Sequence, residues 1–395
     1  MKAKRILFIS LAVAVAAVLA LGAVLFAVSS VRKSRAIASY GDLYVERGVY
    51  SCIASYYKGL FLASLRADGV GAYDTPVFWS LTDAEDVTYA DRLSQSFEKE
   101  IRRILVAAHL FDTASSLSDT EKKNLADTAE NTLTYRAGGD KTVFNRMTEK
   151  YGFTYDDYVK SLTIVYKSSR AQAVIYGENG ENLKNTQDAK TYLSENYKHI
   201  YLLVLRTEDT FLLDEDGNRV TEGGQDVLRN FTDKEKAERA ALIERIRAAI
   251  ANRETGDGEM MNPLMFSTMI ETYDDGEGRD LADGYYFSAG SEFTSEYAGR
   301  YPELVEKALS MTPGEYAECG DGEGKIRFFL ACVEPTSSAD TLSQNARFFT
   351  DFYSRVADAS LEKTMALFLP EVTLTEAALA LDLVSLPYNS EFPLR

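Results

Sequence analysis

The stretch Lys198-His199-Ile200-Tyr201-Leu202-Leu203-Val204-Leu205 decides how the rest of the chain is interpreted. It is almost wholly apolar, with β-branched and aromatic side chains and neither glycine nor proline, which is typical of a buried β-strand. A second apolar run, 326–333, lies far downstream. If the two strands pair, residues 199–334 form one domain. His199 then stands at the rim of its sheet, where a titratable ring often marks a site.

Size and charge limit the classes of protein to consider. The chain has 395 residues, enough for two or three domains, and its 46% hydrophobic content and eight prolines are ordinary for folded proteins. The formal net charge is −17, although the first 35 residues hold six basic residues and no acidic one. Because phosphate binding requires a basic face, this balance argues strongly against a nucleic-acid partner.

The N-terminus carries an apolar run over residues 6–28 that only Ser10 and Gly22 interrupt. At about 1.5 Å per residue it is long enough to cross a hydrocarbon core of roughly 30 Å. A cleavable signal peptide has a shorter apolar centre, although Ala27-Val28-Ser29 leaves cleavage open. We therefore expect residues 1–35 to form a single-pass anchor in the cell membrane, with the body on the extracytoplasmic side.

Helical periodicity and capping motifs dominate the next part of the chain. Three capping boxes, at 118–121, 154–157 and 232–235, each place Ser or Thr three residues before an acid and predict that a helix begins there. The pattern predicts an all-α domain over residues 36–190. The closing segment, 336–395, contains a long helix with nothing of its own to bury against, so we expect it to complete the helical domain.

Residues 191–335 have a different pattern. A short aromatic strand, 284–287, lies between the two apolar runs, and the order strand, helix, helix, strand, helix, strand predicts a small α+β domain with a mixed sheet. Two short strands also flank the acidic stretch Asp214-Glu215-Asp216-Gly217-Asn218. We interpret it as a hairpin turn and not a calcium loop, because the sixth position holds Arg219 where such loops need glycine.

Several kinds of chemistry are excluded by missing partners. The three cysteines are widely separated and form no Cys-x-x-Cys pair, so we expect no zinc site. Ser55 and Lys58 have the Ser-x-x-Lys spacing of penicillin-recognising enzymes, but the same spacing recurs at Ser360 and Lys363, and no Ser-Asp-Asn or Lys-Thr-Gly companion exists. No glycine-rich phosphate loop is present either. We expect no metal and no cofactor.

The order of elements, with several short motifs, resembles a parvulin-type peptidyl-prolyl isomerase domain within a PrsA/SurA-type extracytoplasmic foldase. Residues 199–202 resemble the opening His-Ile-Leu strand of that family. Residues 272–275 and 284–287 resemble its polar active-site loop and the following Gly-aromatic strand. Residues 302–309 and 313–315 resemble its pocket helix and Gly-Glu turn. The resemblance implies a helical chaperone domain joined to a small parvulin-like domain.

The resemblance also implies a site. It assigns His199 and Asp274 as catalytic residues, whereas the second histidine of the family corresponds to Phe328 or Phe329 here. The phenylalanine of the family's proline pocket corresponds to Leu304. The substrate pocket is therefore expected to comprise Leu304, Phe287, Phe328, Phe329 and Tyr301.

Two functions follow from this resemblance. The first is a membrane-anchored foldase that assists unfolded or extended exported polypeptides and retains weak isomerase activity. Isomerisation needs no nucleophile, because the barrier of about 18–20 kcal/mol falls when a twisted amide is bound better than a planar one. The alternative is a non-catalytic holdase or binding module with the parvulin shape, in which His199 only satisfies a backbone group.

Overall fold

The computed structural model describes residues 33–252, 262–275, 284–335 and 346–394. The chain divides into two compact units. Unit 1 consists of the residues up to Glu178 together with those from Asp358 onward, and unit 2 consists of Asn179–Ala357. The second boundary falls inside one helix, α14 (Ala346–Phe368). The closing segment is thus shared between the units, whereas the sequence predicted a boundary near residue 336.

The predicted membrane span, residues 6–28, lies outside the described residues. Within the four described ranges, no helix is long and apolar enough to cross a membrane.

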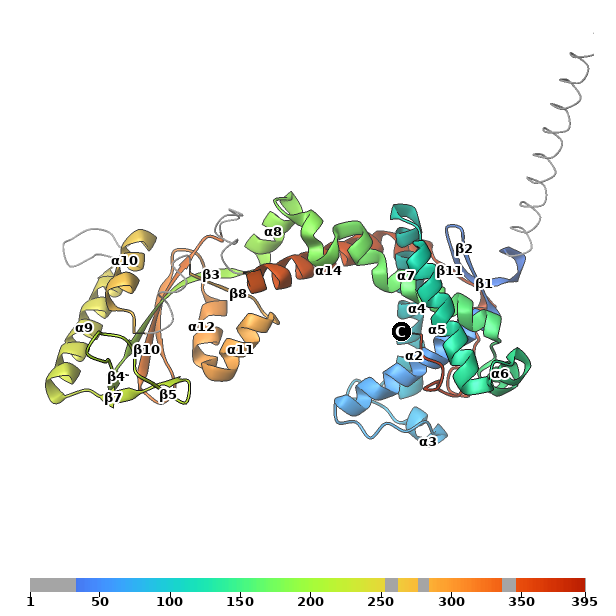
Figure 1. The fold of residues 1–395 in the computed structure, drawn as a ribbon, viewed down its shortest axis with the longest axis horizontal. Coiled ribbons are helices and arrows are strands. Elements are labelled where there is room, and N and C mark those ends of the chain that lie inside the picture. Colours follow the sequence, from blue (N-terminus) through green and yellow to red (C-terminus); the bar gives the residue numbers. More distant parts are fainter. Residues whose placement is uncertain (1–32, 253–261, 276–283, 336–345, 395) are drawn as a thin grey trace, which may run out of the picture. The chain divides into compact units, whose positions relative to one another are not determined.

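Unit 1 is largely helical (Figure 1). Its elements in chain order are β1 (Ala36–Tyr40), β2 (Leu43–Glu46), α2 (Arg47–Ala67), α3 (Pro76–Ser80), α4 (Tyr89–Ala114), α5 (Asp119–Ala137), α6 (Lys141–Thr148), η1 (Glu149–Tyr151), α7 (Tyr155–Tyr176), the end of α14, η4 (Leu369–Glu371), β11 (Thr373–Leu374) and α15 (Glu376–Leu379).

The helices of unit 1 begin where the capping motifs predict. The Ser118 side chain accepts a hydrogen bond from the Glu121 amide, while Glu121 accepts one from the Ser118 amide, and α5 starts at the next residue. Thr154 and Asp157 form the same reciprocal pair before α7. These caps satisfy amide groups that the first turn of a helix leaves without partners. The apolar faces of α2, α4 and α7 then share one core.

Unit 1 is not all-α, which corrects the prediction. Strands β11, β1 and β2 form a small antiparallel sheet in that order. Gly41, at φ +55°, makes the tight turn between β1 and β2. Strand β11 has only two residues and comes from the far end of the chain, so no local sequence pattern predicts it.

Unit 2 is built around a four-stranded sheet. Its elements in chain order are η2 (Glu178–Leu183), α8 (Gln187–Asn196), β3 (Lys198–Arg206), β4 (Asp209–Phe211), β5 (Thr221–Glu222), β6 (Gln225–Asp226), β7 (Leu228–Asn230), α9 (Asp233–Asn252), α10 (Pro263–Tyr273), β8 (Tyr285–Phe287), α11 (Glu292–Arg300), α12 (Pro302–Ser310), β9 (Tyr316–Gly320), β10 (Ile326–Val333) and the start of α14.

The two apolar runs pair as predicted, from His199 opposite Val333 to Arg206 opposite Ile326. The sheet order is β8-β3-β10-β9, and every pair is antiparallel. The predicted mixed sheet is therefore wrong. The sequence analysis missed β9, which joins β10 through the turn at Asp321, and a hairpin partner can only run antiparallel.

The sheet is covered on both faces (Figure 1). One face packs against α9 and α10, with Leu203, Leu205 and Phe329 in its core. The other packs against α11 and α12, with Ile200, Leu202 and Phe328 in its core. Because side chains alternate along a strand, odd-numbered residues of β3 belong to the first face and even-numbered residues to the second. We call these the α9/α10 face and the α11/α12 face.

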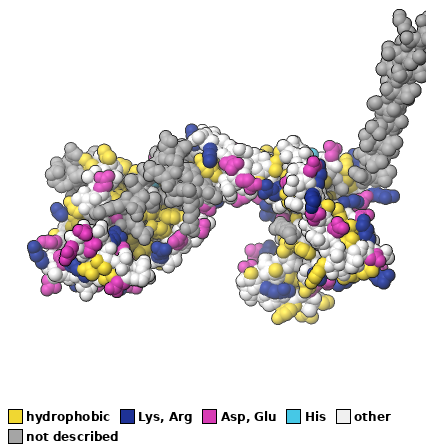
Figure 2. All heavy atoms as spheres, in the orientation of Figure 1, with side chains coloured by type: hydrophobic (Ala, Val, Ile, Leu, Met, Phe, Trp, Pro, Cys, Tyr) yellow, Lys and Arg dark blue, Asp and Glu magenta, His cyan; other side chains and the backbone are white. Residues whose placement is uncertain are grey.

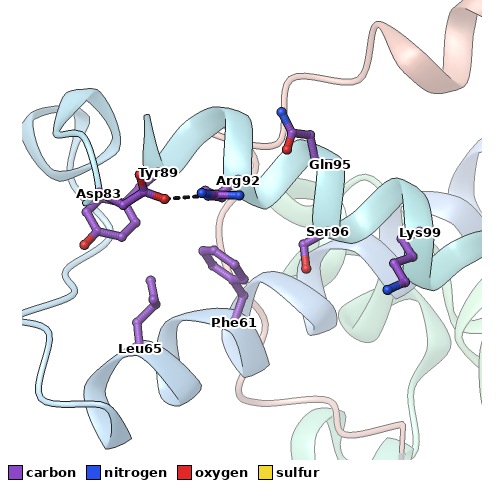
Figure 3. A pocket seen from close by; sticks show the side chains of 8 residues that line it. All are labelled: Phe61, Leu65, Asp83, Tyr89, Arg92, Gln95, Ser96 and Lys99. Carbon is purple, nitrogen blue, oxygen red and sulfur yellow. Dashed lines mark hydrogen bonds and ion pairs between the residues drawn. The ribbon is translucent and has the colours of Figure 1, made fainter. Parts of the chain in front are cut away.

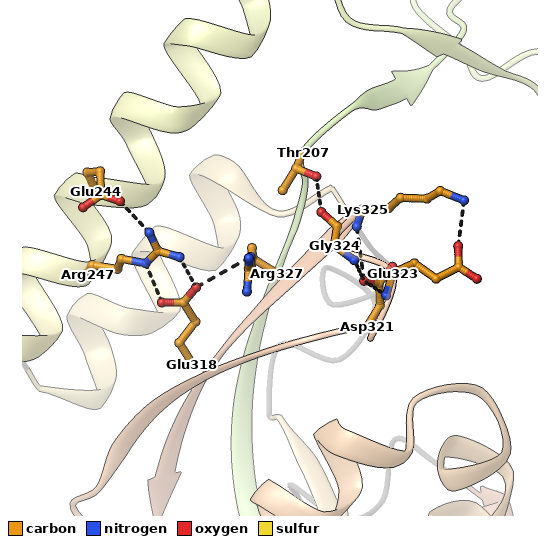
Figure 4. A network of polar contacts seen from close by, with 9 residues as sticks. All are labelled: Thr207, Glu244, Arg247, Glu318, Asp321, Glu323, Gly324, Lys325 and Arg327. Carbon is orange, nitrogen blue, oxygen red and sulfur yellow. Dashed lines mark hydrogen bonds and ion pairs between the residues drawn. The ribbon is translucent and has the colours of Figure 1, made fainter.

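The outer strand β9 is fixed to α9 by charge (Figure 4). The Arg247 guanidinium donates two hydrogen bonds of 2.6 Å to the two carboxylate oxygens of Glu318. At the end of the hairpin, the Asp321 carboxylate accepts hydrogen bonds from the amides of Gly324 and Lys325. The bidentate pair holds the edge strand against the helix, and its charges discourage pairing with another chain.

Candidate functional site

His199 lies inside the α9/α10 face of unit 2. Its side chain is 3% exposed, and its ring stacks on Tyr286 with centroids 4.3 Å apart and an angle of 12°. Tyr201 lies on a second side, at 5.2 Å. Gly284 backs the ring: it has φ +79°, and a Cβ there would lie 3.0 Å from Nε2 of His199. The imidazole is enclosed by aromatic rings and backbone, and a substrate does not reach it in this arrangement.

Asp274 contacts strand β3 at a different place. It follows α10, and its buried carboxylate accepts a 2.7 Å hydrogen bond from the Val204 amide. The next residue continues the pattern, because the Asp275 amide donates to Val204 O and its carboxylate accepts from the Arg206 amide. The two acids thus satisfy the part of the β3 edge that β8, which pairs only with residues 198–200, leaves open.

The structure does not bring the two predicted catalytic residues together. His199 is paired with β8, whereas Asp274 contacts β3 five residues further on, which is about 16 Å along an extended strand.

The five predicted pocket residues are divided between two faces. Phe287, Leu304 and Phe328 lie in the core of the α11/α12 face, with Tyr301 packed against them. Phe329 lies on the α9/α10 face. Of the five, Phe328 and Tyr301 line an open cavity, and their rings meet edge to face at 5.0 Å.

This cavity, of about 240 Å³, opens on the α11/α12 face of unit 2. Its floor is the sheet, through Leu202, Val204 and Phe328, and Tyr297 and Tyr301 from the helices form one wall. The short strands β4–β7, residues 209–230, which we call the arm, contribute Phe211, Arg219 and Asp226 to the lining. The complete lining is Leu202, Val204, Arg206, Phe211, Arg219, Asp226, Asp275, Tyr285, Tyr297, Arg300, Tyr301, Ile326 and Phe328.

Three arginines stand around this apolar floor. The Arg219 guanidinium lies 3.7 Å from the centre of the Phe211 ring and 3.0 Å from Asp226. Arg219 therefore links two of the short strands of the arm to each other. Arg206 forms an ion pair with Asp209, and Arg300 forms one with Glu296 at 3.0 Å. The cavity thus combines aromatic walls with cationic donors, in a protein whose overall charge is strongly negative.

Asp275 is one of the two acidic residues that line the cavity. Burial raises the pKa of its carboxyl above the usual value, while the hydrogen bond from the Arg206 amide and the Arg239 guanidinium at 2.9 Å act in the opposite direction. Both carboxylate oxygens of Asp275 accept hydrogen bonds, one from the Arg206 amide and one from the Arg239 guanidinium. The cavity is equipped to bind and orient an apolar group, and its lining residues include no histidine, serine, threonine, cysteine or lysine.

Most of this lining was missed by the sequence analysis. Phe211 and Arg219 belong to a segment that was interpreted only as a hairpin, and an isolated bridge between Leu213 and Arg219 confirms that turn. Asp214 uses its carboxylate on the amides of Asp216 and Asn218, as a turn residue does. The one available signal was the presence of Tyr297, Arg300 and Tyr301 close together in the sequence, of which the resemblance picked out only Tyr301 as a pocket residue.

No family model matches the chain, and no curated protein matches it. Among solved structures, the chain is similar to foldase protein PrsA from Streptococcus pneumoniae, at 11% identity and a TM-score of 0.21 over 76% of this chain and 97% of that one. It is also similar to foldase protein PrsA from Lactococcus lactis, at 13% identity and a TM-score of 0.19 over 74% and 89%. TM-scores of 0.21 and 0.19 are too low to assign a function to this chain.

Proposed function

We propose that this protein is an extracytoplasmic foldase of the chaperone type, tethered through its N-terminal apolar run, that binds unfolded exported polypeptides. The cavity on the α11/α12 face takes an apolar side chain of the bound segment, and its arginines contact the neighbouring carbonyl groups. The observation that carries this proposal is an open cavity with an apolar floor, aromatic walls and arginine donors.

The size of the cavity supports a side chain as its ligand. Sites for drug-sized ligands and cofactors enclose about 300–1,000 Å³, whereas this one encloses about 240 Å³. Aromatic side chains give affinity without demanding one sequence, because they bury much area for few rotatable bonds. A foldase that serves many clients needs that tolerance.

Prolyl isomerisation is the second candidate. The same cavity sets arginine donors beside an apolar floor, the combination that would stabilise a twisted prolyl amide more than a planar one. The position of His199 weighs against it, because that ring is buried on the opposite face. We therefore place binding first and treat isomerase activity of the parvulin type as the alternative.

The test uses the full-length chain with an unfolded, aggregation-prone protein. We expect the chain to suppress aggregation, and Tyr301→Ala to weaken suppression about tenfold in the concentration required. Tyr135→Ala, which removes a ring that is 83% exposed in unit 1, is the matched control and should act like the parent chain. Equal suppression by both variants would overturn the proposed role of the cavity.

The two candidates separate in a prolyl-exchange assay on short X-Pro peptides. Acceleration that Tyr301→Ala abolishes and Tyr135→Ala leaves unchanged would establish an isomerase that acts in the cavity. We expect no acceleration from a folded chain that still suppresses aggregation.

A further inference from the structure

Residues 386–394, which we call the Phe392 segment, belong to unit 1 and form neither a helix nor a strand. The Phe392 side chain is fully buried. Its ring lies against four aromatic rings from α6, η1, α7 and the link between η1 and α7, at centroid separations from 4.9 to 6.4 Å. These rings, which we call the aromatic pocket, are Phe144, Tyr151, Phe153 and Tyr158. An irregular segment thus inserts one aromatic side chain among helices.

Side chains of the surrounding helices also bind the backbone of the Phe392 segment. The Tyr158 hydroxyl of α7 donates a 3.0 Å hydrogen bond to the Pro393 carbonyl. The buried ammonium group of Lys58 in α2 donates one of 2.7 Å to the Leu386 carbonyl. Every polypeptide presents such carbonyls. Aromatic-lined sites that take proline-containing segments are a recurring mode of peptide recognition, so the segment is held as a bound peptide would be.

The segment is folded by one of its own side chains. Asn389 is only 2% exposed. Its side-chain oxygen accepts hydrogen bonds from the amides of Glu391 and Phe392, at 3.0 and 2.9 Å, and its side-chain amide donates one of 2.9 Å to the Phe392 carbonyl. These bonds satisfy buried backbone groups without help from the helices. The turn that presents Phe392 is therefore a property of the segment itself.

The walls of the aromatic pocket are fixed by contacts that do not involve the segment. Thr154 caps α7, and the Thr148 hydroxyl donates a 2.7 Å hydrogen bond to the Phe153 carbonyl. The Phe144 and Tyr158 rings pack on each other at 5.7 Å. Because these contacts need nothing from the Phe392 segment, we expect the pocket to persist when the segment leaves it.

Other apolar surfaces of unit 1 are open. Hydrophobic side chains gather over α3 (Figure 2), where Val77 is 72% exposed. Phe61 and Leu65 of α2 point into a groove that faces α4 (Figure 3). In the residues that the structure describes, neither surface holds a segment that would identify its ligand. The aromatic pocket differs, because its occupant is visible.

We propose that the aromatic pocket is a peptide-binding site and that the Phe392 segment is its internal ligand, which a client segment with an aromatic residue followed by proline displaces. The occupant defines this partner. Phe392 fills the pocket, and Pro393 keeps the residue before it out of the helical conformation and offers its carbonyl to Tyr158. The inference rests on the proposed chaperone function for its partner, and it adds a second site that the chain itself blocks.

The test adds a fluorescently labelled peptide with the sequence of residues 386–394 to the full-length chain and measures its anisotropy. The parent chain should bind it weakly, because the internal ligand leaves few pockets vacant. We expect Phe392→Ala to bind it with at least tenfold higher affinity. A peptide with serine in place of its phenylalanine should bind neither chain. Excess unfolded client that contains Phe-Pro sequences should displace the labelled peptide.

Further variants locate the binding. Asn389→Ala, outside the pocket, loosens the turn and should raise the affinity about threefold, whereas Tyr388→Ala, whose side chain is 38% exposed in the same segment, should act like the parent. In the Phe392→Ala chain, Tyr158→Phe removes one hydroxyl contact and should lower the affinity about threefold. Leu65→Ala, in the groove between α2 and α4, is the control and should leave it unchanged.

Several outcomes would overturn the inference. A folded Phe392→Ala chain that binds the peptide no better than the parent would show that the pocket is not a site. A Phe392→Ala chain that fails to fold, judged by circular dichroism, would show that the segment belongs to the core and cannot be exchanged. Parent dimers that the peptide dissociates would make a second copy, and not a client, the partner. Loss of binding in Leu65→Ala would place the peptide in the other groove.

The inference and the proposed function fail separately. If aggregation suppression persists and depends on Tyr301 while no variant binds the peptide, the function stands and the inference is wrong. If Phe392→Ala binds the peptide while unfolded proteins still aggregate, the pocket is a peptide site and the chaperone function is wrong.

Discussion

The two faces of the unit 2 sheet contrast sharply, although the same strand supplies both. On the α9/α10 face, β3 contributes His199 to a closed stack of aromatic rings. On the α11/α12 face, it contributes Leu202 and Val204 to an open cavity. A titratable residue at the start of a strand therefore need not mark a site. The cavity that we propose as the binding site lies where the neighbouring helices and the arm leave space, and the alternation of side chains decides which residues of β3 reach it.

The largest effect should come from closing the space behind His199. A Cβ at Gly284 would lie 2.9 Å from Ile200 O, and the residue has φ +79°. We expect Gly284→Ala to lower the free energy of unfolding by roughly 3 kcal/mol, as strain and a backbone clash combine. Gly290→Ala is the control, with φ +74° and open space around it, and should cost only about 1–2 kcal/mol. Denaturant unfolding measures both, and equal losses would show that the close approach is unimportant.

The next effect separates stability from binding. We expect His199→Ala to lower the free energy of unfolding by roughly 2–3 kcal/mol, because a buried ring that stacks on Tyr286 is lost. The affinity for unfolded client should not change, because the cavity lies on the other face. Denaturant unfolding gives the free energy of unfolding. A client titration without denaturant, at a temperature where the variant is folded, gives the affinity. A loss of affinity without a loss of stability would contradict this assignment.

A smaller loss of client affinity is expected when Arg219, in the arm that lines the cavity, is replaced. Arg219→Ala removes the guanidinium that lies over Phe211, and we expect client affinity to fall by a factor of about five, or roughly 1 kcal/mol. Arg219→Lys should recover little of this affinity, because the planar stacking is lost. Full recovery by lysine would mean that charge alone matters there.

The smallest effect is a pH dependence. The folded-state pKa of Asp275 is raised above its ordinary 3.8, so the folded chain holds this proton more tightly than the unfolded chain does. Its charged form therefore costs stability as the pH rises from 3.8 through the raised pKa. Asp275→Asn removes that loss, and the stability of the variant relative to the parent should increase with pH across this window. If the stability of Asp275→Asn relative to the parent fell as the pH rises, the folded-state pKa of Asp275 would be lowered and not raised, which would contradict this prediction.

These contrasts explain which parts could be predicted from the sequence. Strands β3 and β10 could be predicted from their long apolar runs. The capping pairs at Ser118, Thr154 and Thr232 mark helix starts that the structure confirms. Local chemistry decides such features within a few residues. Strand β11 was missed because two residues carry no period, and β9 because it is short and half-exposed.

The site could not be predicted in the same way. The lining of the cavity is drawn from residues between Leu202 and Phe328, and Phe211, Tyr297 and Tyr301 are unremarkable in their own segments. The order of elements in unit 2 was largely predictable, but the register that turns Phe328 to one face and Phe329 to the other exists only once β10 pairs with β3. A pocket inferred by resemblance therefore mixed residues from both faces.

The most direct test of the central claim asks which face of unit 2 meets the client. A photo-reactive phenylalanine analogue is placed in the full-length chain at Arg300, on the rim of the cavity, or at Glu271, exposed on α10 over the other face. The chain is then irradiated with a labelled unfolded protein. We predict cross-linking from position 300 that excess unlabelled client displaces, and none from position 271. Displaceable cross-linking from position 271 alone would contradict the account.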